Sequence, residues 1–159
     1  MEGVARRLVH GLKYRGVLAF ADVMAGLVSS VEPGWVPAAA FAVPLHRSRQ
    51  RRRGFNQAAN LLTALGWPRA DGCLSRLRST STQVGRREQE RRRNVAGAFR
   101  YDGPPLVGLE VAVVDDVITT GATITECARV LREQGAGRIV AVAFARAHYE
   151  PGGKRAIYD

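Results

Sequence analysis

Apolar and polar positions along the chain fall into blocks that predict helices and strands in alternation. Near the amino end, apolar residues recur at helical spacing at Val4, Leu8 and Leu12. A second helical pattern follows in VLAFADVMAGLVSS, and the breakers Pro33, Gly34 and Pro37 end it. We therefore expect residues 1–32 to form a helical amino-terminal segment.

Two units of strand, connection and helix follow this segment. The apolar run Ala38 to Val43 predicts a buried strand, which a basic loop joins to a helix in FNQAANLLTALG. Leu109 to Asp115 predicts a second strand, Ala122 to Gln134 a helix, and RIVAVAFARA a third strand. Strands that are apolar on both faces and alternate with helices predict an α/β fold, in which a parallel sheet is flanked by helices. The tail HYEPGGKRAIYD is typical of a frayed end, and a short final strand there stays open.

Composition narrows the class of protein. The length predicts a single domain over residues 1–159, and 46% hydrophobic with 24% charged residues is typical of a globular protein. No apolar run approaches the roughly 18 residues of a membrane span, so we expect a cytoplasmic protein with no membrane insertion. Cys73 and Cys127 show no CxxC spacing, which predicts two reduced thiols, with Cys127 packed on a helix.

Positive charge is concentrated in the middle of the chain. Between Arg47 and Arg100, 14 arginines stand against three acidic residues, whereas the rest of the chain is nearly balanced, so the net charge of +10 comes from this stretch. Two clusters stand out, His46 to Arg53 and Arg86 to Arg93. Such clusters favour anionic ligands, and the second begins within a polar segment, Ser79 to Glu90, that predicts a long flexible loop.

The segment VAVVDDVITTGAT, Val111 to Thr123, combines a buried strand with two acids and a phosphate-binding turn. Asp115 and Asp116 stand at the carboxyl end of the strand, where open α/β sheets bind ligands. The following TTGAT leads into a helix whose amino-terminal N–H groups favour a phosphate. A plain helix cap would need one side chain only, not two acids, three hydroxyls and a glycine. The pattern therefore predicts a site for a sugar phosphate.

This segment resembles the phosphoribosyl pyrophosphate (PRPP) signature of type I phosphoribosyltransferases. PLHRSRQRRRGFNQA, TQVGRREQERRRNVAGAF and KYRG resemble the ComF branch, the competence protein F and GntX-like group. The resemblance implies that Asp115 and Asp116 are the catalytic acids, meet the ribose hydroxyls and help to hold Mg²⁺ on the substrate. It implies that the 5′-phosphate is bound by Thr119, Thr120, Gly121, Ala122 and Thr123.

The resemblance also implies where pyrophosphate and the closing loop would lie. The loop around Leu45 to Arg47 corresponds to the pyrophosphate grip, although a lone histidine such as His46 is more often structural. Ser79 to Glu90 corresponds to the flexible loop over the site. Further pyrophosphate or loop candidates are Arg53, Arg86, Arg87 and Arg91. Recurrent positions of the branch without an assigned role fall on Arg53, Gly54, Asn56, Gln83, Arg91 and Asn94.

Three functions are open at this point. The first is a PRPP-dependent transferase with an unknown acceptor nucleophile, and the second a PRPP-sensing regulator without catalysis. The third is a competence accessory that binds single-stranded DNA or a partner protein, against which stands the shortage of aromatic residues beside the arginines. Members of the branch commonly begin with a four-cysteine zinc ribbon. This chain has none, so we expect no zinc, and either a zinc-free variant or a start downstream of the natural one. Oligomerisation is left open.

Overall fold

The computed structural model describes residues 18–31, 33–79, 93–148 and 156–158. The helices are α2 (Leu18–Ser29), α3 (Arg47–Arg53), α4 (Gln57–Leu65) and α6 (Ala122–Glu133), with a short 3₁₀ turn at Asp71–Cys73. The strands are β1 (Ala39–Ala42), β2 (Leu74–Arg76), β3 (Phe99–Tyr101), β4 (Glu110–Ile118), β5 (Arg138–His148) and β6 (Ala156–Tyr158). None of the helices within these ranges is long and apolar enough to cross a membrane.

A mixed sheet with the strand order β1-β4-β5-β6 forms the centre of the molecule. β1, β4 and β5 are parallel, with Ala42 opposite Val114 and Val114 opposite Val142. The outer edge of β1 is covered by residues 68–70, because Ala40 N–H donates to Pro68 O at 2.7 Å and Ala70 N–H to Ala40 O at 2.9 Å. The predicted α/β class with a parallel sheet between helices is confirmed.

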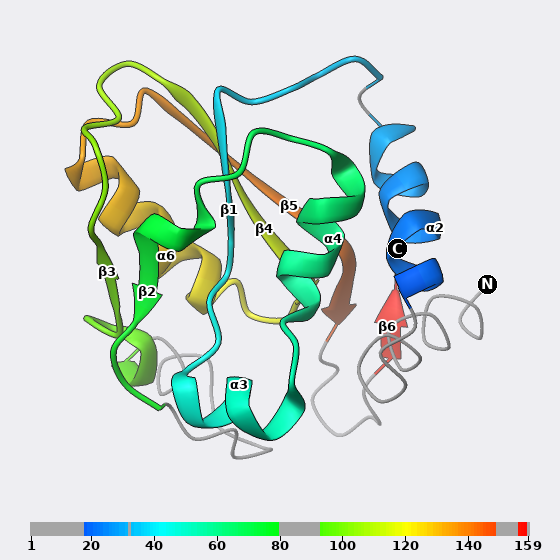
Figure 1. Ribbon diagram of the computed structural model, residues 1–159, viewed down its shortest axis with the longest axis horizontal. Coiled ribbons are helices and arrows are strands. Elements are labelled where there is room, and N and C mark those ends of the chain that lie inside the picture. Colours follow the sequence, from blue (N-terminus) through cyan, green and yellow to red (C-terminus); the bar gives the residue numbers. More distant parts are fainter. Residues whose placement is uncertain (1–17, 32, 80–92, 149–155, 159) are drawn as a thin grey trace.

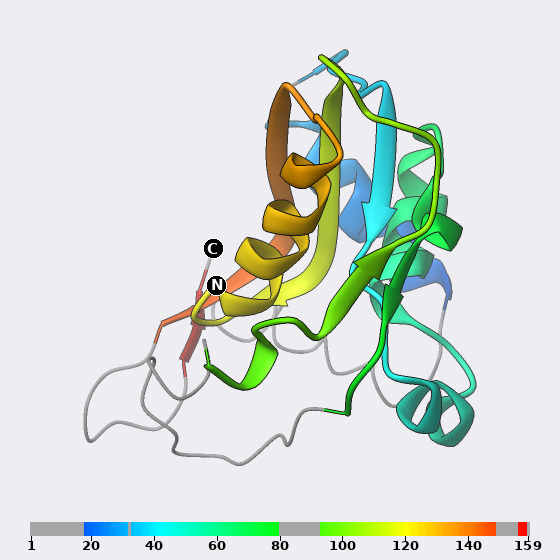
Figure 2. The ribbon, with the colours of Figure 1, turned by 90° about the vertical axis from the view of Figure 1, so that its left-hand side faces the viewer.

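Helices and a second, two-stranded sheet cover the two faces of the central sheet (Figure 1). α4 packs on β1 and β4, and α2 packs on α4 and β5. α6 covers the other face together with the antiparallel pair β2–β3. Figure 2 shows the molecule from the side on which these elements lie. Phe41 of β1 marks this second face, since its ring meets that of Tyr101 of β3 edge-on with centroids 5.9 Å apart.

Each long helix buries one stripe of residues at helical spacing. α2 buries Ala21, Met24 and Ala25, α4 buries Ala58, Leu61 and Leu62, and α6 buries Ile124, Cys127, Val130 and Leu131. The central strands bury Phe41 and Val111 to Val114 between these stripes. The helices predicted in VLAFADVMAGLVSS, in FNQAANLLTALG and at Ala122 to Gln134 are therefore confirmed.

The connection after β1 differs from the prediction. The first arginine cluster, expected to be a loop, is the helix α3. His46 caps its start through a side chain that accepts from Ser48 N–H, and Gly54, with φ of 79°, ends it. Arginine is a good helix former, so two capping residues are enough to turn this stretch into a two-turn helix.

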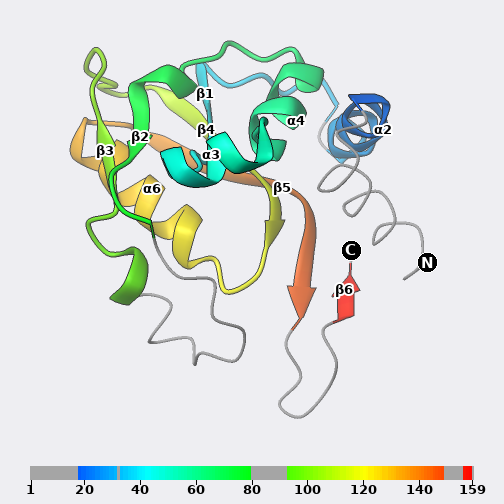
Figure 3. The same ribbon diagram turned by 60° about the horizontal axis from the view of Figure 1, so that its bottom comes forward.

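Three further differences concern strands. β4 runs on to Ile118 because it keeps pairing with β5 at Asp115, Val117 and Ile118, so the strand includes both acids instead of ending at Asp115. The short pair β2–β3 was not predicted, since three-residue strands carry too little periodicity to be recognised. β6, which the sequence left open, pairs antiparallel with β5 at the far edge of the sheet (Figure 3).

Candidate functional site

The end of β1 lies beside the part of β4 that carries the two acids. Val43 N–H donates to Val114 O at 2.8 Å, which sets the end of β1 beside Asp115. Val113 lies opposite Phe41, so odd-numbered residues of β4 face α6 and β3. Strand alternation then directs Asp115 to this face and Asp116 to the face covered by α4. The acids therefore flank the edge of the sheet from both faces.

Both carboxylates are held by the neighbouring backbone. Asp116 N–H donates to Asp115 Oδ1 at 2.8 Å, and Val117 N–H donates to Asp116 Oδ1 at 3.0 Å. Carboxylate oxygens suit Mg²⁺, and two of them fit an ion that keeps water and phosphate oxygens as its other ligands. Within the described ranges, no group of three or more His, Cys, Asp or Glu side chains could hold a metal ion. The donor set thus fits magnesium carried on a phosphate ligand.

The turn after β4 leaves the start of α6 open to a ligand. Gly121 adopts φ of 75° at the cap position, a left-handed conformation that residues with a side chain rarely adopt. Among the described residues, no side chain caps α6 there. The first N–H groups of the helix therefore point outward without a side-chain acceptor. Ala122 is buried, Thr120 and Thr123 are half-buried, and Thr119 is exposed. This geometry suits an anion at the helix start.

The loop between β1 and α3 forms a second wall of the same edge. Leu45 and His46 are half-buried there, and Arg47 is exposed. His46 Nδ1 serves the cap, since Ser48 N–H donates to it at 3.3 Å. An open depression of about 400 Å³ lies beside this loop. It is lined by Pro44, Leu45, Arg47, Gln50, Arg51, Asn56 and Ala59.

Two recurrent positions of the sequence have structural roles. Asn56 caps α4, because its Oδ1 accepts from Ala58 N–H at 3.1 Å, and its Nδ2 donates to Val43 O at 3.0 Å. It thereby ties the start of α4 to the end of β1. Gly54 supplies the left-handed end of α3. Arg53 and Asn94 are half-buried.

Several predicted residues lie outside the described ranges. They are Gln83, Arg86, Arg87 and Arg91, together with most of the loop predicted at Ser79 to Glu90. The roles given to them stay predictions.

Arg76, at the carboxyl end of β2, is a candidate that the sequence reasoning missed. It is half-buried, and its guanidinium lies 5.2 Å from the centre of the Phe99 ring. Burial lowers the pKa of Arg76, the charge of Arg49 lowers it further, and Asp115 acts in the opposite direction. In the sequence it is one of three arginines between the two clusters, with no motif that would single it out.

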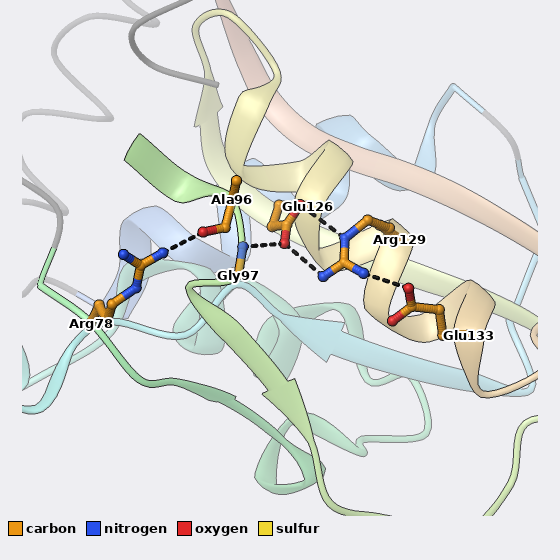
Figure 4. Close-up of polar contacts among 6 residues, drawn as sticks. All are labelled: Arg78, Ala96, Gly97, Glu126, Arg129 and Glu133. Carbon is orange, nitrogen blue, oxygen red and sulfur yellow. Dashed lines mark hydrogen bonds and ion pairs between the residues drawn. The ribbon is translucent and has the colours of Figure 1, made fainter. Parts of the chain in front are cut away.

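A polar network on α6 holds the chain on both sides of residues 80–92 (Figure 4). Gly97 N–H donates to Glu126 Oε1 at 2.7 Å, and Arg129 Nη2 donates to the same oxygen at 2.8 Å. Arg78 donates to Ala96 O, which ties residues before and after this segment together. Hydrogen bonds from Arg129 lower the pKa of Glu126, with a smaller contribution from Gly97, although burial opposes them. The carboxylate therefore stays charged at neutral pH.

The amino-acid sequences of several curated proteins are similar to this chain over most of its length. DNA utilization protein YhgH from Salmonella typhi is 36% identical, over 83% of this chain and 63% of that protein. Competence protein F from Haemophilus influenzae is 39% identical, over 70% of this chain and 52% of that protein. Competence protein ComFC from Streptococcus pneumoniae is 28% identical, over 78% of this chain and 55% of that protein. The chain thus spans less than two thirds of each of these relatives.

The fold has a counterpart among solved structures, although no family model matches the sequence. Glutamine phosphoribosylpyrophosphate amidotransferase from B. subtilis, solved with ADP and GMP, superposes with a TM-score of 0.52 and 20% identity. The match covers 86% of this chain and 28% of that one, and it bears on the fold alone. By its relatives and its fold, the chain belongs to the competence protein F (ComF) family and has the type I phosphoribosyltransferase fold.

Proposed function

We propose that this protein binds PRPP with Mg²⁺ and transfers its phosphoribosyl group to a nucleophile, with release of pyrophosphate. One observation carries the proposal: two acids at the carboxyl end of β4 precede a glycine turn that opens the start of α6. Asp115 and Asp116 would meet the ribose hydroxyls, and Thr119 to Thr123 would bind the 5′-phosphate. A sugar that carries both groups spans these two features.

The charges around this edge suit the reaction. Breaking the bond at C1 of the ribose builds positive charge on the sugar and negative charge on the departing diphosphate. The carboxylates of Asp115 and Asp116 stabilise the positive charge on the sugar, and arginines of α3 stabilise the negative charge on the diphosphate. Mg²⁺, when bound with the substrate, would neutralise part of the diphosphate charge. The pyrophosphate candidates of this proposal are Leu45, His46, Arg47, Arg53, Arg86, Arg87 and Arg91.

A nucleic-acid role is the second candidate, and exposed arginines favour it. Arg47, Arg51 and Arg52 of α3 are exposed to solvent, as a phosphate-binding surface requires. The relatives carry names that speak of competence and DNA utilization. A protein linked to DNA uptake could contact single-stranded DNA or a competence protein through this surface and still bind PRPP.

Isothermal titration calorimetry with PRPP, with and without Mg²⁺, tests the proposal. We expect saturable binding and thermal stabilisation that both depend on Mg²⁺. No heat and no stabilisation at millimolar PRPP would contradict it. Pyrophosphate release in the presence of purines, pyrimidines and amines then separates a transferase from a PRPP sensor. Labelled single-stranded DNA, with PRPP as competitor, tests the second candidate.

A further inference from the structure

α2 is apolar on more of its surface than its neighbours cover. Met24 is fully buried where the helix packs on α4 and β5. Val23 and Leu27, four positions apart on an adjacent side of the same helix, keep 51% and 52% of their surfaces exposed. Figure 3 shows α2 end-on at the rim of the molecule, with α4 on one side of it.

The exposed apolar side continues beyond the end of α2. Ser30 N–H donates to Gly26 O at 3.1 Å, four positions back, so the chain keeps its helical winding past the last residue of α2. Val31, four positions after Leu27, is 81% exposed and extends the stripe. We call Val23, Leu27 and Val31 the outer stripe of α2. A helix that lies on a core needs one apolar stripe, so a second stripe indicates a second packing partner.

The segment directly before α2 carries a matching apolar stripe. Residues 1–17 lie outside the described ranges, but their sequence places Val4, Leu8 and Leu12 at the same interval of four positions. In the helix that this spacing predicts, Arg6 lies on the other side, toward water. Such a segment has one apolar side to bury, and the outer stripe of α2 is the exposed apolar surface nearest to it along the chain.

The two stripes are in register for an antiparallel hairpin of helices. Residues that face each other across such a hairpin share one midpoint in the sequence, because both helices rise by the same distance per residue in opposite directions. Three pairs share the midpoint between positions 17 and 18, namely Val4 with Val31, Leu8 with Leu27, and Leu12 with Val23. All six apolar side chains can therefore meet in a single contact.

The connection between the two helices is long enough for this contact. Five residues separate Leu12 from Leu18, the first residue of α2. The six extended residue steps reach about 20 Å, whereas the axes of packed helices lie about 8–10 Å apart. Gly16, within this connection, suits the end of the first helix.

We propose that residues 1–16 form a helix that packs antiparallel on the outer stripe of α2, with Leu8 against Leu27 at the centre of the contact. A second copy of the chain is a poorer occupant. A stable dimer buries about 1,200 Å² or more in total, and three side chains along one short helix offer only a fraction of that area. The inference goes beyond the proposed function, and the contact needs no ligand.

Disulfide formation between introduced cysteines tests the register in the full chain. The test pair is Leu8→Cys with Leu27→Cys, which face each other under the proposal. The matched control is Val4→Cys with Val23→Cys, which would lie about 12 Å apart along the helix axes. Under mild oxidation the test pair should form an intramolecular disulfide about tenfold faster than the control pair, since a disulfide requires Cα atoms within about 7 Å.

The other outcomes each overturn the proposal. Both pairs are made with Cys73→Ser, which leaves Cys127 as the one further thiol, and Cys127 is buried. Equal rates in the two pairs, or no disulfide in either, would show that residues 1–16 hold no such register on α2. Disulfide-linked dimers of the single variant Leu27→Cys, seen on a non-reducing gel, would assign the outer stripe to a second copy.

Melting temperatures give a second measurement, which decides if the cysteine variants fold poorly. Leu8→Ser and Leu27→Ser should each lower the melting temperature. The double variant should lower it by less than the two single shifts together, because both remove the same contact. Val107→Ser, at a residue that is 77% exposed outside α2, is the control, and its shift should add to that of Leu8→Ser. Additive shifts in the Leu8 and Leu27 pair would contradict the contact.

Discussion

Glu126 on α6 accepts a hydrogen bond of 2.7 Å from the backbone N–H of Gly97, twenty-nine positions away in the chain. The same carboxylate receives two donors from Arg129, at 3.1 Å and 2.8 Å. One nearly buried acid therefore fixes the turn before β3 to the helix that begins at the candidate phosphate turn.

Glu126→Gln should destabilise the protein by about 1–2 kcal/mol at neutral pH, because charge-assisted hydrogen bonds become neutral ones. The folded-state pKa of Glu126 lies below its ordinary value of 4.5. Its stabilisation is therefore present above that value and is lost as the pH falls through the folded-state pKa. Urea denaturation across this pH range should show that the free energy of unfolding falls less steeply with decreasing pH in the variant than in the wild-type protein. Glu133→Gln, on the same helix with 56% of its side chain exposed, is the control and should change little.

Asp115→Asn combined with Asp116→Asn should leave the fold intact and abolish PRPP binding. Each amide keeps an oxygen to accept the backbone N–H of the next residue, and removing two like charges relieves repulsion. The melting temperature should stay the same or rise, whereas calorimetry should show no PRPP binding. Asp102→Asn, at an exposed pair with Arg100, is the control. Unfolding of the double variant would assign the pair a structural role instead.

Gly121→Ala should cost about 1 kcal/mol of stability and weaken ribose 5-phosphate binding, since alanine is strained in the left-handed region. A Cβ there would meet no atom within 4 Å, so strain rather than collision sets the cost. Gly66→Ala is a matched control, with φ of 68° and the same open space at the end of α4. Both variants should lose similar stability, and equal ligand affinity in both would argue against the phosphate role of the turn.

Cys127 should resist alkylation in the folded protein, whereas Cys73 reacts. Burial, with a further contribution from Asp115, raises the pKa of the Cys127 thiol far above its ordinary value, and the thiolate is the reactive form. Cys73 is half-buried. Iodoacetamide labelling at pH 8, read by mass spectrometry, should modify Cys73 first and reach Cys127 only in urea. Labelling of Cys127 at the same rate as Cys73 would show that α6 opens readily.

Much of the secondary structure follows from local patterns. The stripes of α2, α4 and α6 and the apolar runs of β1 and β4 are periodic over enough residues to identify each element. The capping residues of α3 were equally visible in the sequence. The helix itself was missed because α3 buries no residue and so has no apolar stripe at helical spacing.

The sequence by itself determined the type of site, since two acids, a glycine turn and a helix start are neighbours in the chain. The direction of the strand alone places these features at the carboxyl edge of the sheet. Only the tertiary structure decided that Asp115 and Asp116 face opposite sides of the sheet, because that depends on the pairing of β4 with β5 as far as Ile118. It also placed the backbone N–H of Gly97 on the carboxylate of Glu126, and Phe41 of β1 against Tyr101 of β3. These contacts join residues far apart in sequence, and packing of β2–β3 against α6 rather than any local preference creates them.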